Sequence, residues 1–275
     1  MSKKNGILIF IAVLIFISPA IAVIWLYSVN LGGVSKEPND WAAFGSLLSG
    51  VFTYIAASGT MGTLIFLIYQ QSRNNKILDR QIILQNFEEY EKHKKLFFDN
   101  LEEIKNHYNG DIRFPQRDRV YSSIFYMNSP SSMQYKLSID EEGSKPKDLC
   151  DCLNKYRKIE NLLNNYNVFN NCISVIIEMI DLSYDLGITA ASERENGQVL
   201  WFGEPTHLNI NSLRVSLGQI ERTLNMILAM SGNNAVNSIT HKIEPSVFKD
   251  CVLGLLDQKK GRFPVTISGY ESRFS

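Results

Sequence analysis

The chain has 275 residues, of which 45% are hydrophobic and 20% are charged, and its 28 basic side chains equal its 28 acidic ones. This balance lacks the basic excess that is typical of nucleic-acid-binding proteins, so we expect no direct binding to nucleic acid. A local basic patch is still compatible with these totals.

The first long apolar stretch predicts a membrane span at about residues 7–29. These 23 residues carry no charge, and at about 1.5 Å per helical residue they reach roughly 34 Å, enough to cross a hydrocarbon core of about 30 Å. The alternative is a cleaved secretory signal, because Lys3 and Lys4 precede the stretch and Ala20-Ile21-Ala22 resembles a cleavage site. The apolar residues continue to Tyr27, however, beyond the roughly 7–15 residues of a signal core.

A second uncharged run, from Trp41 to Tyr69, predicts a second span at about residues 44–69. Residues 1–72 are then expected to form a transmembrane helical hairpin. The positive-inside rule places both termini in the cytoplasm and residues 30–40 outside, because basic residues gather before the first span and after the second. The residues on which this orientation depends are Lys3, Lys4, Arg73, Lys76 and Arg80.

Small residues recur through the second run at helical spacing, which a plain anchor does not need. Pairs four residues apart, such as Gly45 with Ser49 and Gly59 with Thr63, allow two helices to approach closely and let hydroxyls bond across them. These residues could pack on the first span, but its bulky side chains offer few matching sites, which favours a homo-oligomer. The candidate membrane-packing residues are Trp41, Phe44, Gly45, Ser46, Ser49, Gly50, Ser58, Gly59 and Gly62.

Residues 73–275 are long enough for a cytoplasmic helical domain with its own core. Apolar residues recur in alternate steps of four and three from Ile83 to Tyr108, as in a coiled-coil helix. No proline or glycine separates this pattern from the second span. We therefore predict that the membrane helix continues, or nearly continues, into a stalk that ends at Asn109-Gly110.

Three more helices follow from similar patterns. The spacing from Leu149 to Tyr184 predicts a single long helix that ends at Gly187, where glycine can adopt the left-handed capping conformation. The spacing from Leu213 to Ile227 predicts another helix, and a short one is expected from Val247 to Leu256.

The segments between these helices are expected to be irregular or to carry minor β-structure. Residues 120–127 could form a short strand, and residues 198–205 an exposed aromatic turn. The tail, residues 261–274, alternates as a strand does but has no certain partner. The fold class is therefore predominantly all-α, with minor β or irregular segments.

The sequence contains no motif of a known catalytic or metal site. Phosphate-binding glycine loops and nucleophile elbows are absent, and the four histidines lie at no zinc-ligand spacing. We expect a protein that is not an enzyme, with no catalytic residue, no metal and no cofactor. His107 and His207 are expected to be solvated or to cap a helix. Cysteines of a cytoplasmic domain should stay reduced, as structural thiols. The residues concerned are His93, His107, His207, His241, Cys150, Cys152, Cys172 and Cys251.

The start of the second span carries a W-x-x-F-G-S-x-L-S-G stretch, formed by Trp41, Phe44, Gly45, Ser46, Leu48, Ser49 and Gly50. This stretch and the layout of residues 1–110 resemble bacterial two-span membrane proteins of the phage abortive-infection type, and in particular the transmembrane effectors of retron systems. The cytoplasmic remainder does not match position by position.

The resemblance implies an anti-phage role at the bacterial inner membrane. A reverse transcriptase with its multicopy single-stranded DNA would be the inhibitory partner. Phage interference would release the effector, which would then disturb the membrane and cause abortive infection. The alternatives are a non-toxic membrane adaptor or sensor whose cytoplasmic helices bind a partner protein, and a membrane-tethered enzyme with an unfamiliar site.

Overall fold

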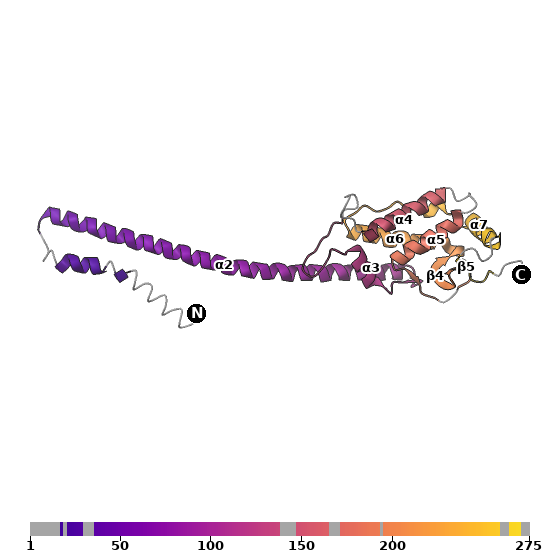
Figure 1. The fold of residues 1–275 in the computed structure, drawn as a ribbon, viewed down its shortest axis with the longest axis horizontal. Helices are drawn as coiled ribbons and strands as arrows, with labels where there is room; N and C mark the ends of the chain where they lie inside the picture. The colour runs from indigo at the N-terminus through magenta and orange to yellow at the C-terminus, as the bar shows by residue number, and fades with distance from the viewer. Residues whose placement is uncertain are drawn as a thin grey trace. The chain divides into compact units, whose positions relative to one another are not determined.

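The computed structural model describes residues 17–18, 21–29, 36–137, 147–164, 171–192, 195–258 and 264–270. Within these residues the chain is mostly helical, with a few short strands (Figure 1). It divides into two compact units, Met1–Gln81 and Ile82–Ser275. The prediction of a predominantly helical fold is confirmed.

The longest element is helix α2, Pro38–His107, which contributes residues to both units. Its first turn suits a helix start, because Pro38 has no N–H to leave unsatisfied and Asp40 complements the positive end of the helix dipole. Among the described residues, α2 is the one helix that is long and apolar enough to cross a membrane. Residues 21–29 are also helical, but most of the predicted first span lies outside the described residues, so the two-helix hairpin stays a prediction.

Helix α2 ends where the sequence predicts. After His107 the chain leaves the helix through Asn109 and Gly110, whose φ angles are 54° and 80°. Glycine adopts this left-handed conformation without strain, which explains the position of the stop. Before this end, Phe97 and Leu101 are fully buried in the core of the second unit. The C-terminal part of the predicted apolar pattern is therefore a core-facing helix surface.

The single helix predicted from Leu149 to Tyr184 is wrong. The structure has two helices here, α4 from Lys147 to Asn164 and α5 from Asn171 to Asp185, which lie side by side (Figure 1). One long helix and two antiparallel helices give the same apolar spacing in the sequence, because in both cases each helical segment presents an apolar face to the core. The spacing therefore could not reveal the break.

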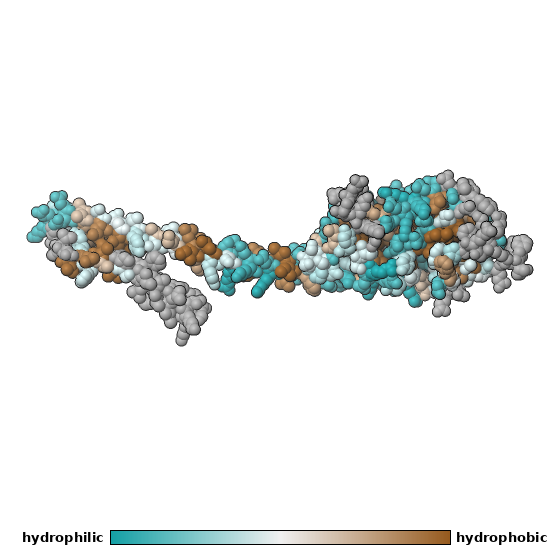
Figure 2. Space-filling model, in the orientation of Figure 1, coloured by the Kyte–Doolittle hydropathy of each residue, from teal (hydrophilic) through white to brown (hydrophobic). Residues whose placement is uncertain are grey.

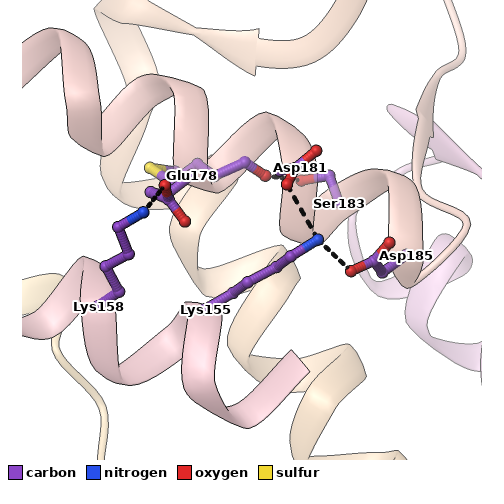
Figure 3. A network of polar contacts seen from close by, with 7 residues as sticks. Lys155, Lys158, Glu178, Asp181, Ser183 and Asp185 are labelled. Carbon is purple, nitrogen blue, oxygen red and sulfur yellow. Dashed lines mark hydrogen bonds and ion pairs between the residues drawn. The ribbon is translucent and has the colours of Figure 1, made fainter. Parts of the chain in front are cut away.

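Ion pairs align α4 and α5 in antiparallel directions (Figure 3). The Lys155 ammonium lies 3.0 Å from the Asp181 carboxylate and 2.6 Å from that of Asp185, and Lys158 pairs with Glu178 one turn along. These groups are partly exposed, and such pairs contribute about 0.2–1 kcal/mol each. They fix the register of the two helices more than they stabilise the domain.

Helix α6, Leu213–Met230, confirms the third apolar pattern. Leu217, Ile220 and Leu224 are completely buried, which makes α6 a central helix of the second unit. Helix α7, Pro245–Gln258, contains the predicted short helix and packs against α5. The 3-10 turns η1, Ile210–Ser212, and η2, Thr240–Lys242, contact α6.

Residues 120–127 do not form the predicted strand. Helix α3 spans Arg117–Ile124, and Val120, Tyr121 and Ile124 are all buried. Their spacing of one and four residues puts them on one side of a helix, whereas a strand would place Val120 and Tyr121 on opposite faces. Burial of this helical face against the core explains the outcome.

The β-structure is confined to short strands. Strands β3, Gln198–Trp201, and β4, Glu204–Asn209, form a hairpin, and β5, Val265–Ile267, pairs antiparallel with β3 in the order β4-β3-β5. The exposed aromatic turn is confirmed at Phe202, and β5 gives the C-terminal tail its partner. Strands β1, Ile112–Arg113, and β2, Thr189–Ala190, form a separate pair.

The second unit contains a disulfide between Cys172 on α5 and Cys251 on α7, with the two Cα atoms 6.6 Å apart. Cys150 and Cys152 do not take part in a disulfide. The expectation that all four cysteines are reduced is therefore wrong for the first pair in this structure. The two partners are 79 residues apart in sequence, so their proximity depends on how α5 and α7 pack.

We expect reduction of this disulfide to lower the free energy of unfolding of the second unit by about 4 kcal/mol, because the bond closes a long loop. Urea unfolding of the detergent-purified, oxidised protein, with and without reductant, measures the difference. Cys251→Ser should be insensitive to reductant, whereas the matched control Cys150→Ser should keep the full effect. Equal stability with and without reductant would contradict the prediction.

Candidate membrane-packing surface

The N-terminal end of α2 carries an aromatic cluster. The ring of Phe44 lies 5.0 Å from that of Tyr27 and 6.2 Å from that of Trp41, measured between centroids. The Tyr27 hydroxyl donates to the carbonyl oxygen of Asp40 at 3.4 Å. Residues 21–29 therefore contact the start of α2 through aromatic side chains. Trp41 and Phe44 are among the residues predicted from the sequence, whereas the contact with Tyr27 was not predicted, because no local pattern indicates it.

The surface of α2 is open around its glycine residues. A Cβ atom added at Gly45, Gly50, Gly59 or Gly62 would meet no atom within 4 Å in the part of the chain that the structure describes. Ser46 and Ser49 are exposed, and Ser58 is half-buried. The predicted residues thus share one helix, distributed around its circumference, with space for a close neighbour.

The hydroxyl groups of this segment bond within α2 itself. Thr53 donates to the carbonyl of Ser49 at 2.9 Å, Thr60 to that of Ala56 at 3.0 Å, and Thr63 to that of Gly59 at 2.9 Å. A hydroxyl that donates to its own helix has no second proton for another helix. These three hydroxyl groups therefore cannot also donate the hydrogen bonds that we expected between helices. The property of this segment that favours close packing is the small size of its side chains.

Apolar side chains follow the small residues toward the C-terminal end of the span. Each is more than half exposed, and Figure 2 shows apolar surface along this part of α2. Exposed apolar surface of this extent is typical of contact with lipid or with another protein. The residues are Leu64, Ile65, Phe66, Leu67, Ile68 and Tyr69.

The apolar face also continues beyond the predicted span. The pattern that begins at Ile83 is buried at Phe97 and Leu101, but Ile83 and Phe87 are 61% and 48% exposed. The core of the second unit therefore covers only the C-terminal part of the pattern. The uncovered part gives α2 a second apolar surface, next to the polar residues that follow Tyr69.

Two of the histidines, His93 and His207, have buried ring nitrogens in the second unit. His93 is buried, and its Nδ1 lies 2.9 Å from the Tyr121 hydroxyl. Burial lowers the pKa of His207 to about 4, so this imidazole is neutral at pH 7. His207 lies within β4 and its Nε2 is buried, so the expectation of a solvated or helix-capping His207 is wrong. No group of three potential metal ligands occurs among the described residues.

No known protein family, curated protein or solved structure matches this chain. The most distinctive chemical feature of the chain itself is the small-residue surface on an apolar helix, open at its four glycines.

Proposed function

We propose that this protein is an anti-phage defence effector that disturbs the bacterial inner membrane when it is activated. The observation that carries the proposal is the small-residue surface of α2. No described atom lies within 4 Å of a Cβ added at its four glycines, and the helix is apolar enough to cross a membrane. A simple anchor needs only apolar bulk, whereas this surface permits close helix association.

Helix α2 also joins the two parts that such an effector needs, a segment that can enter the membrane and a folded domain that can bind an inhibitor. Its N-terminal part is apolar and exposed, while Phe97, Leu101 and Ile104 at its other end belong to a folded core. Because α2 also contributes to the core of the second unit, a partner that binds this unit can keep the membrane segment inactive. We propose that release of this partner allows α2 segments of several copies to associate through Gly45–Thr63 and open the membrane.

The inhibitory partner in this proposal is a reverse transcriptase with its multicopy single-stranded DNA, as the resemblance to retron effectors implies. The protein itself is proposed to have no enzymatic activity. The exposed apolar residues Ile83 and Phe87 would extend the contact between copies beyond the membrane.

Expression of the full chain alone is expected to depolarise the inner membrane and stop growth, because no inhibitor restrains it. A voltage-sensitive dye and colony counts measure both effects after induction. Residues 73–275 expressed alone should be harmless. Toxicity without the spans would indicate an enzyme. Absence of depolarisation by the full chain, in uninfected and infected cells alike, would indicate an adaptor.

The proposed arrangement is multi-pass, with both termini in the cytoplasm. Reporter fusions within residues 30–40 and after Ser275 are expected to report outside and inside, respectively, because of the distribution of Lys and Arg. An external C-terminal reporter would contradict the hairpin.

A further inference from the structure

The surface of the second unit has a hollow between the C-terminal part of α2 and the segment that joins β1 to α3. Its volume is about 240 Å³. The apolar lining comes from Phe98 and Leu101 on α2 and from Phe114 on the connecting segment. Leu101 is fully buried, whereas the two phenylalanines are partly exposed and available for contact.

Three cations border this apolar lining: Lys105, Arg113 and Arg117. Glu102 also lines the hollow, and its carboxylate pairs with Lys105 at 2.6 Å, so these two charges compensate each other. Within the described ranges, neither Arg113 nor Arg117 has a carboxylate within ion-pair distance. The border therefore carries two uncompensated guanidinium groups.

Arg117 is held in place by an aromatic ring. Its guanidinium carbon lies 4.5 Å from the centroid of Phe98, a cation–π contact that leaves the N–H groups at the edge of the guanidinium free. The adjacent Asp118 does not neutralise it, because Asp118 pairs with Lys94 at 2.9 Å. Arg117 is thus positioned to bind an incoming carboxylate with two hydrogen bonds.

The start of α3 lies at the same border. Arg117 is the first residue of α3, and Gln116 before it makes no side-chain capping bond to the helix. The first-turn N–H groups of a helix have no partner within the helix and favour negative charge. The hollow therefore combines an apolar interior with an anion-binding edge.

We propose that this hollow is a docking site for an acidic peptide segment of a partner protein, with one large apolar or aromatic side chain inserted between Phe98 and Phe114. The volume supports a side chain over a complete small molecule, because small-molecule pockets usually measure about 300–1,000 Å³. The two arginines select carboxylates beside the inserted residue. The hollow lies in the second unit, outside the predicted span at residues 44–69, so it goes beyond the proposed membrane function.

Fluorescence anisotropy with a labelled peptide, Gly-Asp-Glu-Trp-Glu-Asp-Gly, tests the site on the full chain in detergent. We expect binding that weakens about tenfold or more with Arg113→Gln or Arg117→Gln, since each removes charge-assisted hydrogen bonds. A peptide with glycine in place of tryptophan should also bind at least tenfold more weakly. Lys92→Gln is the matched control, because Lys92 is a strongly exposed cation of α2 outside the hollow.

Arg117→Lys keeps the charge and should restore part of the affinity, and thermal unfolding checks that each variant is folded. Several results would overturn the proposal: no binding by the unaltered protein, equal weakening by Lys92→Gln, or binding that ignores the tryptophan. Full competition by inorganic phosphate or adenosine monophosphate at micromolar concentration would overturn it as well and assign the hollow to a small phosphate-bearing ligand.

Discussion

Replacement of Gly50 or Gly59 by leucine is expected to leave the protein in the membrane and yet abolish its self-association and the depolarisation of infected cells. Leucine favours the bilayer, and no described atom lies within 4 Å of a Cβ at either position. Neither change should therefore disturb the fold of the chain itself. Between two helices, however, the added bulk prevents the close approach that small residues permit.

The two glycines test different sides of α2. They are nine residues apart, and because each helical residue turns by about 100°, they lie on opposite faces. If one leucine variant alone is inactive, its face is the contact surface. Gly50→Ala and Gly59→Ala, which each add one methyl group, are the graded controls and should retain most of the activity.

The measurement is the membrane potential of infected cells, with each variant at the same level in the membrane, together with chemical cross-linking of the membrane fraction. Normal depolarisation by both leucine variants would exclude packing through the Gly45–Thr63 surface. Loss of cross-linking together with normal depolarisation would show that membrane damage does not require self-association, and this result would also contradict the mechanism.

Phe97→Asp is expected to unfold the second unit. The Phe97 ring is fully buried, with centroids 5.4 Å from Tyr121 and 6.0 Å from Phe125. Loss of a buried phenylalanine costs about 3–5 kcal/mol, and a buried carboxylate without a partner costs several more. This sum is similar to the total stability of a typical domain, about 5–15 kcal/mol.

Thermal unfolding and limited proteolysis of the purified protein measure this effect. Leu96→Asp is the matched control, because Leu96 is the preceding residue of α2 and is 53% exposed, so its change should stay within about 0.5 kcal/mol. Leu101→Asp, at another buried position of α2, should act as Phe97→Asp does. Wild-type protease resistance of both buried variants would show that α2 is not part of this core.

The candidate surface was identified in the sequence because its chemistry is local. Small residues at a spacing of four are visible without any tertiary structure, and Gly45, Gly50, Gly59 and Gly62 all fall within α2. The Tyr27 contact to Phe44 and the hollow beside Arg113 and Arg117 were not predicted. Each depends on segments that meet only after the chain has folded.

The sequence by itself determined the features that depend on neighbouring residues. The apolar period places α6 and α7, and Asn109-Gly110 ends α2 because this pair tolerates left-handed backbone angles. The tertiary structure decided the separation of α4 from α5, the helical state of residues 117–124 and the pairing of Cys172 with Cys251. In each of these cases the local pattern is compatible with two structures, and burial against residues distant in the sequence selects the one that forms.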